Sequence, residues 1–237
     1  MPMRTAAILP IKSFGAAKQR LSPALAGGAR QALAQAMFSD VLSSLKKVKR
    51  VDSITVVSAD PVVDAAARGS GVTVVVDPVE SGQSDATMVG IRHALSSGFE
   101  RVLLVPGDTP LLDPDELDAL LARGEADGMQ VVIVPDRHGS GTNALMISPP
   151  AAFEPSFGPH SLDRHVTLAQ EAGLRHSVEE VPSLSHDIDT PDDLGALAGV
   201  LEGRRAVAPM TRGALRQLDR ARSGRFSAQA EPEALEV

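Results

Sequence analysis

The sequence contains no cysteine, tryptophan or tyrosine, and aromatic residues make up only 3% of it. The absence of cysteine excludes disulfides, thiolate metal sites and a cysteine nucleophile. The scarcity of aromatic side chains argues against recognition of nucleic-acid bases by stacking. No charged-then-apolar leader precedes the first apolar segment, and no apolar run approaches the roughly 18 residues of a membrane helix. We therefore expect a cytoplasmic protein with no membrane partner.

An excess of positive charge is also missing, because the formal net charge is −7 over 237 residues. Duplex-binding surfaces need clustered lysine and arginine, so we expect no nucleic-acid partner. A few local cations can still hold a small anionic substrate. The length and the ordinary composition, 43% hydrophobic and 22% charged, favour one sizeable α/β domain.

Apolar, β-branched runs alternate with helical patterns along the chain. The predicted strands are residues 5–11, 54–58, 72–76, 102–105 and 131–134. The predicted helices are residues 28–48, 61–68, 84–95, 114–123 and 161–172. Near-continuous apolar strands are covered on both faces, which favours a mostly parallel sheet. The sequence thus predicts a Rossmann-like, three-layer α/β/α fold with its ligand site at the carboxyl ends of the strands.

The last part of the chain differs from the rest. From Arg204 onward it has several arginines and few β-branched residues, and it ends in a polar, acidic stretch. We predict a catalytic domain over residues 1–203, and a surface helix followed by a disordered end over residues 204–237.

Three cations lie in the loop after the first predicted strand: Lys12, Lys18 and Arg20, in the segment LPIKSFGAAKQRLSP (residues 9–23). Gly15 permits close backbone approach there. This loop lies where α/β folds bind phosphates, and ammonium and guanidinium donors suit a triphosphate. The P-loop pattern is absent. We interpret the loop as an anion site, the alternative being a basic, solvated loop.

Carboxylates are placed to face that loop. Asp108 follows the apolar strand in VLLVPGDTPLLDP (residues 102–114), and Asp187 and Asp189 lie two apart in HDIDTPDDL (residues 186–194), just before a predicted helix. A carboxylate beside phosphates repels them unless a cation intervenes, and Mg²⁺ binds through one or two carboxylates together with phosphate oxygens. We predict that these three aspartates hold Mg²⁺. Alternatively, Asp108 only caps its turn.

A glycine-rich segment, GSGTNA (residues 139–144), formally fits a dinucleotide-binding fingerprint. That fingerprint requires a helix to begin there, whereas NALMISP (residues 143–149) is short, apolar and ended by proline, as in a strand. We expect instead that Gly139, Gly141 and Thr142 bring backbone amides and a hydroxyl to a small ligand.

The segment FGPHSLDRH (residues 157–165) is a candidate for the second wall of the predicted ligand site. Gly158 permits close approach, and Ser161 is the expected N-cap of a helix, where anions bind readily. Alternatively, Ser161 merely caps the helix. His160 and His165 show no metal-ligand spacing, so we expect core packing or exposure for each.

Together these segments resemble the phosphoenolpyruvate and 2-phospho-L-lactate guanylyltransferases of coenzyme F-420 biosynthesis, within the GT-A-like nucleotidyltransferase superfamily. The resemblance runs over residues 3–201. It is carried by LPIKSFGAAKQRLSP, PGDTPLL, GTNAL, FGPHS and DIDTPDDL.

The resemblance implies transfer of GMP from GTP to a phosphorylated three-carbon acid with release of pyrophosphate, on a nucleotide-diphospho-sugar transferase fold. It implies that phosphoenolpyruvate binds at Thr142, Gly158 and Ser161. Metals would bind at Asp108, Asp187 and Asp189, with Lys18 and Arg20 stabilising the leaving pyrophosphate. The resemblance also implies that Lys12, Lys18, Arg20 and Ser84 bind the nucleotide.

Several alternatives stay open. The acceptor can be phosphoenolpyruvate, 2-phospho-L-lactate or 3-phosphoglycerate, and a related transferase would use a sugar phosphate. A glycosyltransferase would use Asp187 and Asp189 as its D-x-D element, although that element comes late here. A nucleotide-binding regulator would bind GTP without turnover. The sequence also leaves a homodimer open.

Overall fold

The centre of the protein is a seven-stranded β-sheet. The computed structural model describes the backbone of residues 3–77, 82–204 and 206–228, and side chains up to residue 220. The strand order is β3-β2-β1-β4-β6-β5-β7. The strands are β1 (Thr5–Pro10), β2 (Ser53–Val57), β3 (Thr73–Val75), β4 (Arg101–Leu104), β5 (Val131–Pro135), β6 (Thr142–Ile147) and β7 (His176–Val178).

The sheet is mostly parallel, as the sequence predicts. Only β6 runs antiparallel to its neighbours, β4 and β5. The connection from β5 to β6, residues 136–141, is a short hairpin, which is too short for the crossover that a parallel pair requires. The reversal matters for function, because it brings the first residue of β6 to the edge where β1, β4 and β5 end.

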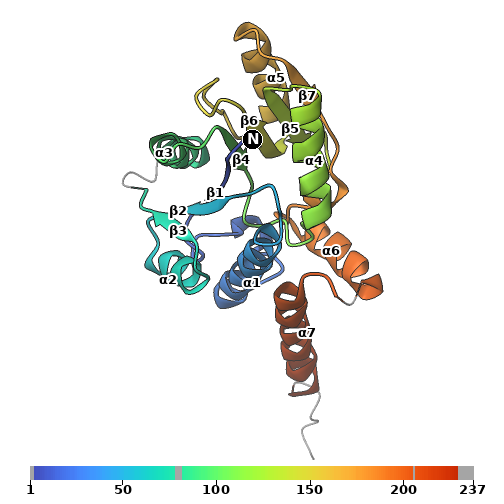
Figure 1. The fold of residues 1–237 in the computed structure, drawn as a ribbon. Helices are drawn as coiled ribbons and strands as arrows, with labels where there is room; N and C mark the ends of the chain where they lie inside the picture. The colour runs from blue at the N-terminus through green and yellow to red at the C-terminus, as the bar shows by residue number, and fades with distance from the viewer. Residues whose placement is uncertain (1–2, 78–81, 205, 229–237) are drawn as a thin grey trace, which may run out of the picture.

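Helices cover both faces of the sheet, which makes the fold three-layered (Figure 1). The helices are α1 (Gly27–Leu45), α2 (Pro61–Gly69), α3 (Gln83–Ser96), α4 (Pro114–Ala126), α5 (Ser161–Glu171), α6 (Pro191–Gly203) and α7 (Pro209–Ala228). Alternate strand residues point to opposite faces. Leu9 and Val105 pack with α1, α2 and α4, while Ile8 and Leu104 pack with α3 and α5.

A third apolar cluster joins helices α6 and α7 to α1. Met37 of α1 and Leu197 of α6 are both fully buried in it. The Asp40 side chain accepts hydrogen bonds from the backbone N–H groups of Met210 (3.2 Å) and Thr211 (2.8 Å), so it caps the start of α7. Helix α7, which lies in the segment after Arg204, is thus anchored on α1. Residues 229–237, where a disordered end is predicted, lie outside the described residues.

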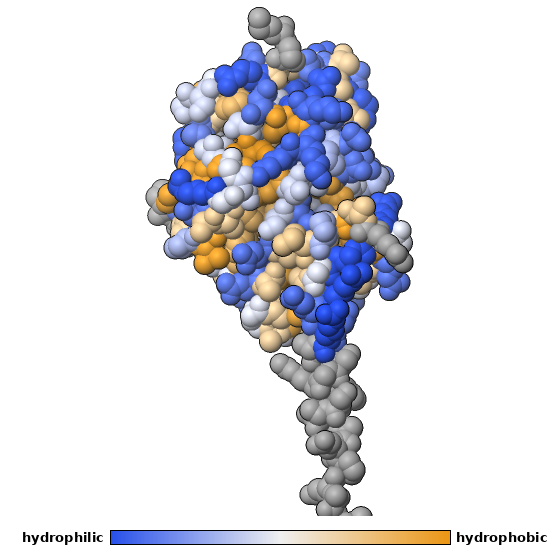
Figure 2. All heavy atoms as spheres, turned by 60° about the horizontal axis from the view of Figure 1, so that its bottom comes forward, coloured by the Kyte–Doolittle hydropathy of each residue, from blue (hydrophilic) through white to orange (hydrophobic). Residues whose placement is uncertain are grey.

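The molecular surface mixes hydrophobic and hydrophilic side chains, with an apolar area in the upper part of Figure 2 bordered by hydrophilic groups. The large exposed apolar side chains are scattered over the elements: Val62, Val76, Leu95, Val178 and Met210. Among the helices described here, none has the length and apolar character needed to cross a bilayer.

Most elements fall where the sequence predicts them, and the exceptions have physical reasons. Strand β7 has no counterpart in the predicted elements, because it is a three-residue edge strand with no apolar run. Helix α4 begins as expected, with Asp113 accepting hydrogen bonds from two first-turn N–H groups ahead of Pro114. Helix α5 ends before Gly173, whose φ of +64° is left-handed.

Candidate active site

The candidate site lies at the edge of the sheet where β1, β4 and β5 end and β6 begins. Strands β1 and β4 are parallel neighbours, so the loops after Pro10 and Leu104 leave the sheet side by side. Thr142 pairs with Pro135 at the same edge. The segments carrying Lys18, Asp108 and Thr142, which are far apart in the sequence, therefore converge because of the strand order.

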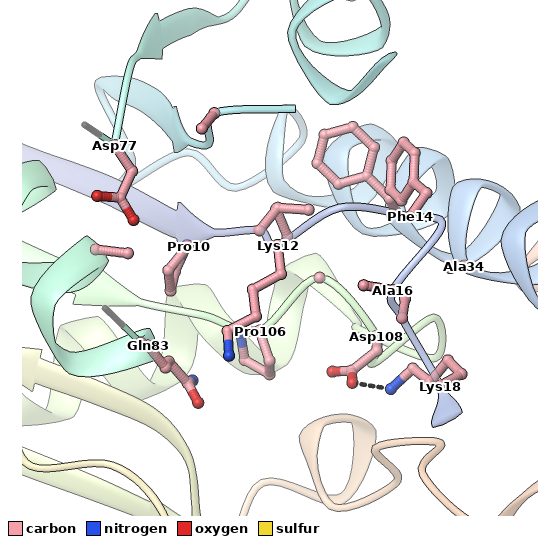
Figure 3. A pocket seen from close by; sticks show the side chains of 17 residues that line it. Pro10, Lys12, Phe14, Ala16, Lys18, Ala34, Asp77, Gln83, Pro106 and Asp108 are labelled. Atoms are coloured by element: carbon pink, nitrogen blue, oxygen red, sulfur yellow. Dashed lines mark hydrogen bonds and ion pairs between the residues drawn. The ribbon is translucent and has the colours of Figure 1, made fainter. Parts of the chain in front are cut away.

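A cavity of ≈ 300 Å³ opens between these loops (Figure 3). The residues lining it are Pro10, Ile11, Lys12, Phe14, Ala16, Ala17, Lys18, Ala34, Phe38, Ala59, Asp77, Gly82, Gln83, Ala86, Pro106, Gly107 and Asp108. In Figure 3 the side chain of Lys12 extends between Gln83 on one side and Asp108 on the other. The cavity thus combines an apolar wall with cationic groups, which suits a ligand with a flat ring and an anionic chain.

Gly107 shapes the wall beside Asp108. A Cβ atom at this position would overlap Cδ1 of Ile11 and would lie 3.6 Å from the Phe38 ring. Glycine therefore lets the loop after β4 pack closely against the loop after β1. This close approach brings Asp108 to the anion loop.

The Lys18 ammonium lies between two carboxylates. It contacts Oδ2 of Asp108 and lies 2.9 Å from Oδ1 of Asp189, and its side chain is only 7% exposed. Lys18 has a left-handed backbone, with φ of 58°. Burial by itself would lower the pKa of Lys18, but the charges of Asp108 and Asp189 outweigh it and the pKa is raised. Lys18 is therefore a permanent cation in this cluster.

The two other predicted cations are more exposed. Arg20 has a side chain that is 75% exposed, with its guanidinium 3.7 Å from Oδ2 of Asp189. Lys12 is exposed and lines the cavity. Both can reorient toward a bound anion at little cost, because neither is held in a buried ion pair.

Asp187 belongs to the same cluster but is held differently. Its Oδ1 accepts a hydrogen bond of 3.1 Å from the Asn143 side chain, which also donates to the carbonyl of Leu184 at 2.7 Å. Burial raises the pKa of Asp187, and the nearby charges of Asp108 and Asp189 raise it further against the effect of Asn143. The three predicted aspartates thus lie near enough for their charges to interact, although only Asp108 and Asp189 contact Lys18.

The donor set fits a divalent cation only in part. Within the described part of the chain, no three carboxylate or histidine side chains are arranged as a ready metal cage. Asp108 and Asp189 nevertheless direct oxygens at the same Lys18 ammonium. Mg²⁺ needs just one or two protein carboxylates and completes its shell with water and phosphate oxygens. These residues therefore fit a Mg²⁺ ion that takes most of its oxygen ligands from water or from a bound anion.

An ion pair at the surface, with only its carboxylate buried, supports the loop of Asp189. Asp193, in the first turn of α6, accepts hydrogen bonds from the backbone N–H groups of Asp189 (3.0 Å) and Thr190 (2.6 Å). Arg137, from the β5–β6 hairpin, forms an ion pair with Asp193. Although burial opposes it, hydrogen bonds from Thr190 and Asp189 and the charge of Arg137 lower the pKa of Asp193. The hairpin thus fixes the position of Asp189 through α6.

The residues predicted to bind the acceptor acid, Thr142, Gly158 and Ser161, lie near the start of β6. The Thr142 hydroxyl lies 2.9 Å from Nδ1 of His165, and the FGPHS loop passes beside the same imidazole. Gly158 has φ of +114°, a conformation that favours glycine. The N-cap of α5 is His160, not Ser161 as the sequence predicts; Ser161 is the first helical residue and is buried, at 2% exposed.

The structure bears on two other expectations. Two amides of the GSG turn have partners within the protein, because the N–H of Gly139 donates to the carbonyl oxygen of Asp136 at 3.1 Å and the N–H of Ser140 donates to the Asp136 side chain at 2.9 Å. Ser84, whose role as a nucleotide ligand stays a prediction, is not among the residues that line the cavity. Its hydroxyl accepts a hydrogen bond of 3.0 Å from the backbone N–H of Phe157.

Sequence reasoning missed three side chains that organise the site: Arg137, Asn143 and His165. Asn143 lies within the GTNAL segment, so its position beside Thr142 is the one signal that could have revealed it. Arg137 and His165 carry no such signal, because their partners come from distant parts of the chain.

Comparison with solved structures places the fold in a known class. The chain resembles a protein from Desulfovibrio desulfuricans G20, described as a candidate nucleotide-diphospho-sugar transferase, with a TM-score of 0.74 and 16% sequence identity. The match covers 91% of this chain and 95% of that one. At this identity the likeness establishes the fold, which is the GT-A-like α/β fold predicted from the sequence.

Sequence comparison then identifies the family. Residues 5–218 match the family described as "Guanylyl transferase CofC like". The chain is 50% identical over 216 residues to a phosphoenolpyruvate guanylyltransferase of Conexibacter woesei, covering 91% of this chain and 97% of that protein. It is 35% identical over 204 residues to a 2-phospho-L-lactate guanylyltransferase of Methanothermobacter thermautotrophicus, covering 86% and 88%. The chain therefore belongs to the CofC-like guanylyltransferase family, as the motifs indicate.

Proposed function

We propose that this protein transfers GMP from GTP to phosphoenolpyruvate in the presence of Mg²⁺, releasing pyrophosphate and forming enolpyruvyl-diphosphoguanosine for coenzyme F-420 biosynthesis. The observation that carries the proposal is the convergence of Lys12, Lys18 and Asp108 on one cavity, with Thr142 at the same sheet edge. The 50% identity to a phosphoenolpyruvate guanylyltransferase supports this acceptor.

The reaction brings two polyanions together. An oxygen of the acceptor phosphate attacks the α-phosphorus of GTP, and the bond from that phosphorus to the bridging oxygen of the β-phosphate breaks, so pyrophosphate leaves. The acceptor phosphate is already ionised at neutral pH, so no general base is needed. Two unit charges 4 Å apart repel by about 1 kcal/mol in water, and by several times more in a partly dry cleft. The site must therefore supply positive charge.

The chain's own cations are placed for that task. Lys12 reaches into the cavity and Arg20 is free to turn, so both can hold triphosphate oxygens. Lys18 is fixed beside Asp108 and can stabilise the charge that develops on the departing pyrophosphate. When bound through Asp108 and Asp189, with Asp187 nearby, Mg²⁺ would screen the phosphate charges and align the two ligands. Positioning and electrostatics supply the catalysis.

A second acceptor, 2-phospho-L-lactate, has support from the relative at 35% identity. It differs from phosphoenolpyruvate in having an sp³ carbon with a methyl group where phosphoenolpyruvate has a methylene double bond. The polar groups around Thr142 can bind the carboxylate and phosphate that both acids carry, so they do not discriminate between them.

An assay for pyrophosphate release tests the proposal. Purified protein is incubated with GTP, ATP or CTP against phosphoenolpyruvate, 2-phospho-L-lactate, 3-phosphoglycerate and a sugar phosphate, with Mg²⁺ or with EDTA. We expect turnover with GTP, phosphoenolpyruvate and Mg²⁺. Preference for 2-phospho-L-lactate would favour the second candidate, and turnover with the sugar phosphate alone would contradict both. Activity that is undiminished in EDTA would refute the metal requirement.

The location and assembly of the protein are further proposals. We expect a cytoplasmic enzyme, because its substrates are metabolites of the cell interior. A homodimer stays a prediction, which the mass measured by light scattering of the purified protein would test.

A further inference from the structure

His165 uses both nitrogens of its ring inside the protein. The residue lies on α5 and is fully buried. Its Nε2 atom lies 3.0 Å from the backbone nitrogen of Ser156, and its Nδ1 atom lies 2.9 Å from the Thr142 hydroxyl. The ring therefore connects β6 with the loop that carries Gly158.

The partners of the ring determine where its proton lies. The backbone N–H of Ser156 can only donate, so Nε2 of His165 must accept and carries no hydrogen. A neutral imidazole has one proton, which must then lie on Nδ1. Nδ1–H is a donor, so the Thr142 hydroxyl oxygen accepts from it.

This arrangement determines the direction of the Thr142 hydroxyl proton. Its oxygen receives the imidazole proton, so its own hydroxyl proton must point away from His165. Among the residues that the structure describes, His165 is the one hydrogen-bond partner recorded for this hydroxyl. The hydroxyl of Thr142, which is half-buried at the start of β6, is thus available as a donor to a ligand.

The surroundings keep the imidazole neutral. The Phe157 ring meets it edge-on, with centroids 5.1 Å apart, and the Phe153 ring lies at 6.1 Å. Burial, together with the positive charge of the neighbouring Arg164, lowers the pKa of His165 to about 4. Arg164 itself donates to the carbonyl oxygens of Ser156 and Pro159, so it holds the same loop from the other side.

We propose that His165 is a positioning residue that makes Thr142 a hydrogen-bond donor to the anionic acceptor, and that ties Thr142 to the Gly158 loop. The chemical class of the ligand is a phosphorylated carboxylic acid, which offers only acceptor oxygens. The identity of that acid rests on the proposed function, whereas the orientation of Thr142 rests on the hydrogen bonds alone.

The tautomer can be measured without any substrate. Histidine-selective ¹⁵N labelling of the full chain, with assignment by a His165→Asn variant, reports the protonation of each ring nitrogen. We expect a protonated Nδ1 and an unprotonated Nε2 at pH 7.5. A protonated Nε2 would overturn the inference, even in an active enzyme. The expected tautomer in a protein that turns over none of the acids would refute the proposed function and leave the orientation of Thr142 standing.

Three substitutions then test the link to the acceptor. His165→Asn keeps an N–H donor near the position of Nδ1, His165→Gln places its amide near Nε2, and His165→Phe keeps a ring without either group. We expect the acceptor KM to rise about tenfold in H165F and H165Q, and by less than about threefold in H165N, with the GTP KM unchanged. His176→Asn, on the edge strand β7, is the matched control and should alter neither KM.

A double variant separates positioning from simple loss of packing. If His165 acts through Thr142, H165F combined with Thr142→Val should raise the acceptor KM no further than T142V alone. Additive effects would overturn the proposal, as would equal acceptor KM values in H165N and H165Q. Should H165F fail to fold, the comparison of H165N with H165Q decides alone.

Discussion

Two neighbouring parts of the candidate site are built on opposite principles. The charged cluster consists of Lys12, Lys18, Arg20, Asp108, Asp187 and Asp189, and the neutral corner consists of Thr142, Ser156, Gly158, Ser161 and His165. The side chains of Arg20 and Asp189 in the charged cluster are 75% and 44% exposed. In the neutral corner, His165 is fully buried and Ser161 is 2% exposed.

The difference reflects what each part has to do. A triphosphate and a metal ion are recognised mainly by charge, which acts over several ångströms and tolerates mobile side chains. A small acid must instead be held with its phosphate facing the α-phosphorus, which requires donors of fixed direction on rigid elements. We therefore propose that the charged cluster supplies rate, while the neutral corner supplies orientation.

The largest expected effect is the loss of the Asp108 carboxylate. Asp108→Asn keeps the side-chain shape but removes the charge beside Lys18, so we expect kcat to fall about 1000-fold with the fold intact. Steady-state kinetics and circular dichroism measure the two properties. Asp64→Asn, which removes an exposed ion pair on α2, is the control and should change kcat little. Turnover within about tenfold of the wild type would exclude Asp108 from the catalytic machinery.

The neutral corner should respond to pH through His165. The pKa of about 4 in the folded protein lies below the unfolded value of about 6.5, so between these values only the unfolded chain binds the proton. The contribution of the neutral His165 ring to the free energy of unfolding is complete above pH 6.5 and is lost as the pH falls toward 4. Urea unfolding should show that, between pH 6.5 and pH 4, the free energy of unfolding falls by about 3 kcal/mol more in the wild type than in H165N. If the free energy of unfolding changed with pH in the same way in both proteins, this would argue against a neutral, buried imidazole.

A smaller effect is expected at Lys18. Lys18→Met removes the cation between Asp108 and Asp189, and we expect kcat/KM for GTP to fall about 100-fold, since charge-assisted hydrogen bonds are the strong ones. The acceptor KM should change little. Initial rates at varied GTP and saturating acceptor provide the measurement, and an equal rise in both KM values would mean that the variant disturbs the whole site.

The smallest effect concerns the support of the Asp189 loop. Arg137→Gln breaks the ion pair with Asp193, so the backbone of Asp189 is held less firmly and kcat/KM should fall about fivefold. Arg123→Gln, which breaks a comparable pair with Glu179 away from the site, is the matched control. Equal activities in the two variants would show that the ion pair contributes nothing to the site.

The charged cluster and the neutral corner also differ in how far they can be predicted from the sequence. The strands and the charged residues that follow them can be predicted because apolar runs and ionised side chains are local signals: Lys12 comes two residues after β1, and Asp108 comes four residues after β4. The neutral corner depends on contacts between β6, α5 and the loop at Ser156, which no local pattern reveals. A buried histidine in a helix has the same sequence signature whether it packs in a core or orients a hydroxyl.

The N-cap of α5 illustrates the limit further. Ser161 has the residue type that favours a cap, but His160, with a left-handed φ of 58°, takes the N-cap position, so Ser161 is the first helical residue. Propensity identified the helix correctly. The loop that enters it decided the position of the serine side chain.

The most direct test of the division is a cross-comparison of KM values in two single variants. Lys12→Ala, in the charged cluster, should raise the GTP KM about tenfold and leave the acceptor KM unchanged. Thr142→Val, in the neutral corner, should raise the acceptor KM about tenfold and leave the GTP KM unchanged. If each variant instead raised both KM values to the same extent, the assignment of donor and acceptor to separate parts of the site would be wrong.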